Sequence, residues 1–153
     1  MSGRLLAGWR RRKLRRRGVV IGSGTCFENV RFEGSARIEP DCRIHGDPEV
    51  VFGDHFCMNA FSEVQGDVRF GRDVRLGPKV VIWDRCDPAG AAERGARAPV
   101  RIGDGVWIAA SSIVLGGVTI GSGSVVGAGS VVVADLAPRS VAVGNPLRVL
   151  RQR

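Results

Sequence analysis

The chain has 153 residues, of which 44% are hydrophobic and 25% charged, so it is long enough for a single domain with a buried core. Its 22 glycines and its lack of tyrosine are typical of a thin solenoid packed with short side chains. The formal net charge of +8 lies entirely in residues 1–17, and the body balances 15 acidic with 15 basic side chains, which disfavours a nucleic-acid-binding domain.

The first predicted element is this basic arm, residues 1–17, in which Leu5, Leu6 and Trp9 supply an apolar side at roughly helical spacing. A short amphipathic helix is expected, too short to span a bilayer and without the apolar run of a signal peptide. Three interpretations remain open: a solvated cap of the fold, a segment attracted to an anionic membrane surface or to phosphate-bearing substrates, and, least favoured, a nucleic-acid contact. The predicted location is cytoplasmic, with peripheral contact at the inner face of the membrane under the second interpretation.

Residues 18–143 carry a hydrophobic side chain at every sixth position. The cleanest stretch is Ile102, Ile108, Val114, Ile120, Val126 and Val132. A second, mostly small or β-branched side chain recurs four residues after each of these, at Val106, Ser112, Val118, Ser124, Ser130 and Leu136. Three six-residue units close one coil of about 18 residues, which predicts an all-β fold, a single-stranded parallel β-helix.

The same period extends towards the N-terminus with two changes of register. Cys26 is assigned to the inward position of the first register, which continues to Ile44. A two-residue insertion within 46–51 then starts a second register that runs from Phe52 to Ile82.

An external loop and a cap complete the predicted organisation. Between Ile82 and Ile102 there are two residues more than three repeats need, so one corner bulges outward as the loop 84–98. Residues 144–153 are expected to cap the C-terminal end of the solenoid, because a solenoid leaves its terminal coils open.

The four cysteines show no metal-binding or redox spacing. Cys26 and Cys42 are predicted to be small core residues, which favours a reducing compartment.

Four segments resemble the hexapeptide-repeat O-acetyltransferases, which include maltose and galactoside acetyltransferases and enzymes that acetylate bacterial polysaccharides. They are residues 98–108, 114–121, 126–130 and 144–151. The resemblance implies a left-handed β-helix, a homotrimer with active sites between subunits, and transfer of an acetyl group from acetyl-CoA to a sugar or glycan hydroxyl, without a metal.

The family's catalytic histidine is replaced in this chain. Relatives carry it in the loop after the strand that corresponds to residues 80–82, and counting in register places Asp87 at that position and Arg85 at an earlier histidine. An alternative alignment deletes the histidine altogether. Asp87 is therefore the predicted general base, and Asp84 and Arg85 are predicted to contact the acceptor. The histidines present, His45 and His55, lie in earlier coils, and His55 is interpreted as structural.

Other positions acquire roles through the resemblance. Asn59 matches an asparagine that lines the acceptor site. Acetyl-CoA binding is expected at Trp107, Ala110, Ala128, Arg148 and Arg151. Arginine suits the phosphates because its guanidinium is always charged and presents a fixed fork of donors. The chain departs from the family at Val133 and Ala134, where relatives have Thr and Lys near the nucleotide.

Three function classes are weighed. The first is a CoA-dependent O-acetyltransferase. The second is a catalytically silent β-helix that acts as a scaffold or as the partner of an active paralogue, which the replaced histidine favours. A zinc β-helix hydratase is disfavoured, because it needs three histidines and the chain has two.

Overall fold

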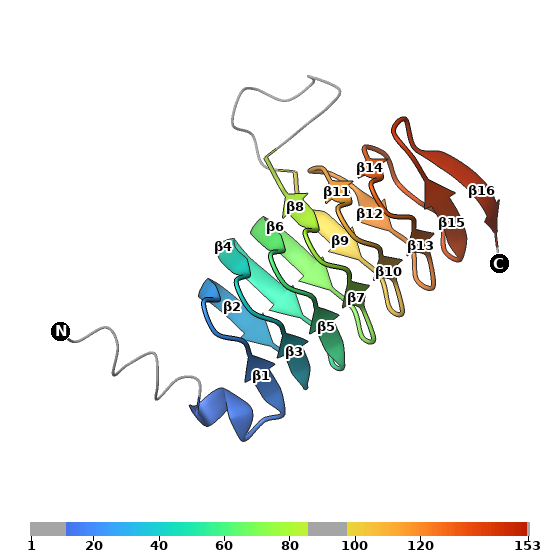
Figure 1. Cartoon of the computed structure of the whole chain (residues 1–153). Helices are drawn as coiled ribbons and strands as arrows, with labels where there is room; N and C mark the ends of the chain where they lie inside the picture. Colours follow the sequence, from blue (N-terminus) through green and yellow to red (C-terminus); the bar gives the residue numbers. More distant parts are fainter. Residues whose placement is uncertain (1–11, 86–97, 153) are drawn as a thin grey trace.

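The computed structural model describes residues 12–85 and 98–152. These residues form a stack of short parallel strands with about six turns, and the strands of successive coils lie side by side along one axis (Figure 1). The predicted left-handed parallel β-helix of hexapeptide repeats is confirmed. Each coil presents three faces to solvent, and the core fills the space between them.

The first face is a parallel sheet with one strand from each coil, closed at its C-terminal end by an antiparallel strand. Its strands are β1 (Val19–Ile21), β3 (Ala36–Ile38), β5 (Phe56–Met58), β7 (Arg75–Leu76), β10 (Trp107–Ile108), β13 (Val125–Val126), β15 (Ser140–Val143) and the closing β16 (Arg148–Gln152).

The second and third faces share three long strands that bend: β2 (Cys26–Phe32), β4 (Arg43–Phe52) and β6 (Glu63–Phe70). The first half of β6 pairs with β8 and its second half with β9, so each long strand passes from the second face to the third. The remaining strands of the second face are β8 (Val81–Trp83), β11 (Ile113–Val114) and β14 (Val131–Val132). Those of the third face are β9 (Val100–Ile102) and β12 (Thr119–Ile120).

Three edges separate these faces. We call the turns between the first and second faces the first edge, those between the second and third faces the second edge, and those between the third and first faces the third edge. The loop that starts at Asp84 leaves the second edge, because it follows β8 and precedes β9.

Aromatic rings fill the core of the first three coils. Phe52 stacks on Phe32 and Phe70 with ring centroids 5.3 and 5.2 Å apart, and Phe56 packs 4.3 Å from Phe52. All four rings are buried. The neighbouring Cys42 is also buried, as predicted, and burial raises the pKa of its thiol, which keeps it protonated and unreactive.

Valine, isoleucine and serine fill the core of the later coils. All the inward positions predicted between Ile102 and Leu136 are buried. The buried serines bond to backbone: Ser130 Oγ donates to the Gly127 carbonyl (2.6 Å) and accepts from the Gly144 N–H (2.9 Å). Each hydroxyl therefore satisfies backbone groups that the turns leave unpaired.

The inward assignment of Cys26 is wrong, since its side chain is exposed. The inward pair of this coil is Thr25, which is buried, and Phe27, which packs against the core. Phe32 is the fifth residue after Phe27 and not the sixth, because the strand changes register between Glu28 and Val30. A count of six back from Phe32 therefore lands on an outward position.

The two ends of the solenoid are covered differently. At the N-terminal end, residues 12–15 form one helical turn whose Leu14 packs against the core. At the C-terminal end, β16 pairs antiparallel with β15 and covers the open edge of the first face. Within the described residues, the structure has no helix of the length and apolar character needed to cross a membrane.

Candidate functional site

The first edge is a ladder of turns in which each coil hydrogen-bonds to the next. The N–H of Ser111 donates to the Pro78 carbonyl (2.9 Å), and the N–H of Gly129 donates to the Ala110 carbonyl (2.9 Å). The N–H groups of Ala110 and Ala128 themselves donate to no carbonyl within the described part of the chain. Two small residues on successive coils thus leave backbone donors available to a ligand that runs along the edge.

An exposed tryptophan lies beside this edge. Trp107 projects outward from the first face, 52% exposed, and it pairs in register with Arg75 on one side and Val125 on the other. At the end of the same face, Arg148 and Arg151 are exposed on β16. Neither guanidinium has a hydrogen-bond or ion-pair partner among residues 12–85 and 98–152. All five positions predicted to bind the cofactor therefore lie on the first face or the first edge.

Asn59 lies on the first edge one coil before Pro78. Its side-chain Nδ2 and its backbone N–H both donate to the Leu76 carbonyl, each at 3.0 Å. The side chain is exposed, so its amide oxygen is left on the surface of the edge. The structure thus places the predicted acceptor residue on the same edge as the predicted cofactor residues.

Asp84 is buried at the root of the loop. One carboxylate oxygen, Oδ2, accepts from the Asp67 N–H (2.9 Å), whereas Oδ1 has no hydrogen-bond partner within the described residues. Gly66 makes room for it, because a Cβ there would lie 1.9 Å from the Asp84 carboxyl carbon and Gly66 has a φ of 98°. Asp67 is held in turn by Arg101 (2.8 and 3.2 Å). In this chain Asp84 anchors the loop, and its contact with an acceptor stays a prediction.

Arg85 points back along the second edge. Its Nη2 donates to Asp47 Oδ2 at 2.9 Å, which fixes the guanidinium against a corner two coils earlier. Asp87, the predicted general base, lies outside the described residues. The loop root and the predicted cofactor residues thus occupy different edges of one chain.

The two histidines have different surroundings. On the third edge, both ring nitrogens of His55 lie near carboxylates: Nδ1 is 3.4 Å from Asp73 and Nε2 is 3.8 Å from Asp54. On the second face, His45 Nδ1 lies 3.2 Å from Glu28, and no ion pair engages its Nε2 within the described residues. Of the two rings, only that of His45 keeps one nitrogen away from the carboxylates of the described residues, so it is the better placed to accept a proton from a ligand.

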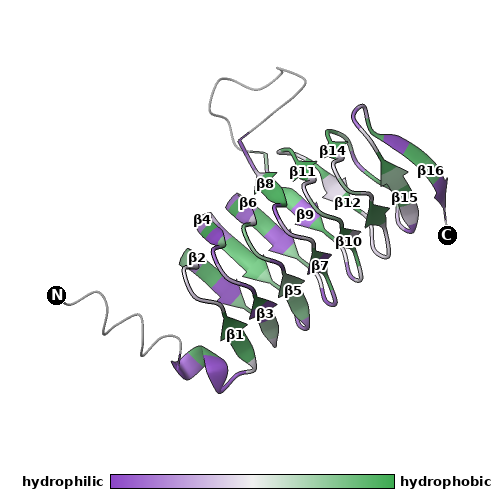
Figure 2. Cartoon of the chain, in the orientation of Figure 1, coloured by the Kyte–Doolittle hydropathy of each residue, from purple (hydrophilic) through white to green (hydrophobic). Residues whose placement is uncertain are grey.

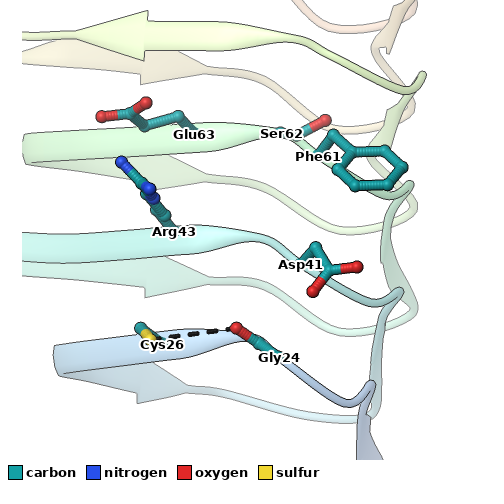
Figure 3. A pocket seen from close by; sticks show the side chains of 7 residues that line it. All are labelled: Gly24, Cys26, Asp41, Arg43, Phe61, Ser62 and Glu63. Carbon is teal, nitrogen blue, oxygen red and sulfur yellow. Dashed lines mark hydrogen bonds between the residues drawn. The ribbon is translucent and has the colours of Figure 1, made fainter.

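A hollow of about 420 Å³ lies at the N-terminal end of the first edge (Figure 3). Seven residues line it: Gly24, Cys26, Asp41, Arg43, Phe61, Ser62 and Glu63. Sequence reasoning missed it, because it joins residues of three coils. One signal was available, an aromatic residue at a turn position that polar residues and glycine occupy in the other coils.

No group of three or more metal-ligating side chains lies close together in the described parts of the chain. Of the cysteines in those parts, Cys26, Cys42 and Cys57 are all free.

Comparison with known proteins agrees with this arrangement. The family model of the bacterial transferase hexapeptide (six repeats) matches residues 99–134. A putative acetyltransferase of Schizosaccharomyces pombe is 36% identical, over 91% of this chain and 69% of that protein.

Two solved structures share the fold. A maltose O-acetyltransferase from Clostridium difficile 630 is 33% identical with a TM-score of 0.64, over 94% of this chain and 74% of that one. A variant of GDP-perosamine N-acetyltransferase from Caulobacter crescentus, in complex with CoA and GDP-perosamine, is 25% identical with a TM-score of 0.75, over 96% of this chain and 65% of that one.

The fold and these matches define a hexapeptide-repeat transferase. The chain belongs to the hexapeptide-repeat acetyltransferase family. It spans between 65% and 74% of the length of the three relatives compared.

Proposed function

We propose that the protein transfers an acetyl group from acetyl-CoA to a hydroxyl of a sugar or polysaccharide intermediate. The observation that carries the proposal is the first edge, where the N–H groups of Ala110 and Ala128 have no acceptor within the described residues and the exposed Trp107 of the first face lies beside them. Two arginines without partners in the described residues, Arg148 and Arg151, lie on β16 at the C-terminal end of the first face. These residues fit acetyl-CoA, because an amide-bearing arm needs backbone donors and a nucleotide needs cations for its phosphates. The thioester supplies the activated acetyl group.

The sugar acceptor is supported by the relatives. The Clostridium difficile enzyme is a maltose O-acetyltransferase, and this chain covers 74% of its length at 33% identity. The Caulobacter crescentus protein is an N-acetyltransferase of a nucleotide sugar. Because a sugar is the acceptor in both names, the proposal assigns a sugar here and takes oxygen as the acceptor atom from the more similar enzyme.

The active site is proposed to form between copies in a homotrimer. The loop root lies on the second edge and the cofactor residues lie on the first edge and first face, so within one chain they face different directions. The second face supplies a contact surface, because in the later coils its outward side chains are apolar. We call this surface the apolar patch, and it consists of Val81, Trp83, Ile113, Leu115, Val131 and Val133. Figure 2 shows β8 and β11 of this face in the hydrophobic colour, whereas β4 and β6 carry hydrophilic stretches. An exposed apolar sheet face of this kind is stabilised when another copy covers it.

Two side chains are candidates for the proton acceptor. Asp87 occupies the register position of the family's histidine, and His45 is presented by Glu28 with its Nε2 free of ion pairs in the described residues. Turnover of Asp87→Asn, His45→Gln and His55→Gln separates them. We expect one of the first two variants to lose nearly all turnover while CoA binding persists, and His55→Gln to behave as the parent. Full activity in both Asp87→Asn and His45→Gln would exclude both residues.

CoA binding is the experiment that tests the proposal as a whole. In calorimetry, Arg148→Ala and Arg151→Ala should each weaken CoA binding by about 1.5–3 kcal/mol, the worth of a hydrogen bond to a charged group. Arg139→Ala is the matched control, because Arg139 is also exposed but lies on the third edge. If the parent protein binds no CoA, the enzyme function is excluded.

A catalytically silent β-helix is the second candidate, and the contact between Arg85 and Asp47 favours it. Relatives have a histidine where Arg85 stands, and here that side chain is held in an ion pair of 2.9 Å away from the first edge. A silent protein will bind CoA or its partner without turnover, and Asp87→His combined with Arg85→His should then produce measurable acetyl transfer. Turnover by the parent protein would exclude this candidate.

The basic arm is proposed to contact anionic membrane surfaces. Residues 12–17 hold five Lys and Arg side chains without an acid, beside the N-terminal end of the solenoid. Sedimentation with anionic vesicles at low salt, and release as salt screens the charges, is expected. Equal sedimentation with neutral vesicles would favour the solvated cap.

A further inference from the structure

Phe61 departs from the pattern of the first edge. At the corresponding turn position every other described coil has glycine or a polar residue with a positive φ. These residues are Gly24, Asp41, Lys79, Ser111 and Gly129. Phe61 has a φ of 60° and its ring is 60% exposed.

This arrangement is unfavourable in two respects. A bulky side chain in the left-handed region strains its own backbone, and an exposed aromatic ring forgoes hydrophobic burial. The backbone N–H of Phe61 donates to the Pro40 carbonyl at 3.3 Å, as the equivalent N–H groups of the other coils do. Any residue makes that bond, so the turn itself does not require phenylalanine. Within the described residues most of the Phe61 side chain stays uncovered, which points to a partner outside the chain.

The hollow runs from the Phe61 ring at the edge, past Asp41, to Arg43 and Glu63 on the strands. Figure 3 shows Phe61 and Asp41 at the edge and the side chains of Arg43 and Glu63 on the adjoining strands. Asp41 reaches over Gly24, where a Cβ would lie 1.9 Å from its Oδ1. Arg43 has no hydrogen-bond or ion-pair partner in the parts of the chain that the structure describes. The hollow therefore offers one aromatic face, acceptors on two carboxylates and the donors of a free guanidinium.

The charge of the hollow narrows the ligand class. Asp41 and Glu63 together outweigh Arg43, which leaves one net negative charge and disfavours a phosphate or another anion. Hydroxyl groups donate to carboxylates and accept from a guanidinium, so a neutral polyol satisfies all three groups. A ring with an apolar face and hydroxyl edges also covers an exposed aromatic face.

We propose that this hollow binds the sugar acceptor, with one face of a pyranose ring against Phe61 and the acceptor's hydroxyls bonded to Asp41, Arg43 and Glu63 along the hollow. This proposal rests on the proposed function, because it names the place where that function's acceptor lies. The hollow shares the first edge with Ala110 and Ala128, and Asn59 lies two residues before Phe61 in the same turn. A sugar held at Phe61 therefore lies on the same edge as the backbone donors proposed to bind acetyl-CoA.

The test measures sugar binding without CoA. Saturation-transfer NMR is recorded with methyl glycosides of glucose, galactose and N-acetylglucosamine, and with glycerol as a polyol that has no ring. We expect at least one glycoside, but not glycerol, to receive saturation on the protons of one ring face. Phe61→Asn should weaken its binding roughly tenfold, and Phe61→Trp should retain it.

Stability separates a binding role from a structural one. Asparagine tolerates the left-handed region, so Phe61→Asn should leave Tm unchanged or raise it while binding is lost. Arg139→Asn is the matched control, since Arg139 has a φ of 63° on the third edge. It should show the same direction of Tm change and unaltered glycoside binding. Phe61→Gly provides a second test if the asparagine variant does not fold.

Several outcomes overturn the proposal. They are the absence of binding for all three glycosides, equal binding by the parent and Phe61→Asn, and a smaller mass of Phe61→Asn in light scattering, which would make the ring a contact between copies. CoA calorimetry on the same samples distinguishes the two proposals. Glycoside binding without CoA binding excludes the enzyme function and keeps the sugar site. CoA binding without glycoside binding excludes the sugar site and keeps the enzyme function.

Discussion

The first three coils and the last three are built on the same six-residue repeat and filled in opposite ways. In the first three, phenylalanine rings occupy the core, and the outward positions of the second face are charged or polar, as at Arg43 and Glu63. In the last three, valine and buried serine occupy the core, and the second face is the apolar patch. The early coils therefore derive stability from their own apolar burial. The later coils depend more on hydrogen bonds at the turns and on a neighbour that covers the second face.

The largest expected effect is on assembly. Ile113 is 38% exposed in the centre of the apolar patch, so Ile113→Arg should convert a homotrimer into a species near the chain mass of 16.3 kDa. Light scattering measures the mass of the assembly. The matched control is Val20→Arg, since Val20 is 41% exposed on the first face of the first coil and should leave the assembly intact. If the parent is already a monomer at micromolar concentration, the second face has no such partner.

The aromatic core should show the next largest effect. Phe52 contacts three other rings, so Phe52→Ala should lower the free energy of unfolding by about 3–5 kcal/mol. Val126→Ala in the later coils removes two methyl groups and should cost about 1.6 kcal/mol. Denaturant unfolding of both variants provides the comparison. Equal losses would mean that the two halves do not differ in how they are stabilised.

A buried serine tests the other half of the comparison. Ser130→Ala removes the acceptor of the Gly144 N–H and should cost about 1–2 kcal/mol, because the partner is left unpaired. Ser23→Ala is the control, since Ser23 is exposed and its replacement should change stability by less than about 0.5 kcal/mol. A similar small change for Ser130→Ala would show that water replaces the lost bond.

The smallest expected effect is the change of stability at low pH. Hydrogen bonds from the hydroxyl and N–H of Ser35 lower the pKa of Asp54, so its ionised form stabilises the folded state at neutral pH. That contribution is complete above about pH 4, the ordinary range of the carboxyl, and is lost as the pH falls through the lowered value. The Tm difference between the parent and Asp54→Asn should therefore be present at pH 7 and shrink below pH 4. A difference that is independent of pH would contradict the assignment.

The fold was predictable because the inward positions obey a strict period. Every coil must place a large side chain at the same point of the core. Residues such as Ile108 and Val126 can therefore be identified from the sequence by their spacing. The assignment of Cys26 failed for the same reason. A strict count cannot show that one corner, between Phe27 and Phe32, is a residue short.

The candidate site was predictable only where single residues carry the resemblance. Trp107 and Ala110 were predicted in this way, and the structure places them on the first face and the first edge. The contact of Arg85 with Asp47 was not predicted, because it joins positions 38 residues apart across a corner. The hollow at Phe61 was also not predicted. Its lining comes from three coils, and no local sequence pattern brings Cys26 and Glu63 together.

The closed root of the external loop has a consequence for how this chain can change. The Ala98 N–H donates to the Asp84 carbonyl at 2.8 Å, and the Ala98 carbonyl accepts from Gly117 in the next coil (2.8 Å). The hydrogen-bonded ladder thus continues past the insertion as if Asp84 and Ala98 were neighbours. Because closing a longer loop costs little additional entropy, the segment between them can be exchanged or extended without altering the register of the coils. The β-helix is in this respect a frame that accepts a different segment between Asp84 and Ala98 without a new fold.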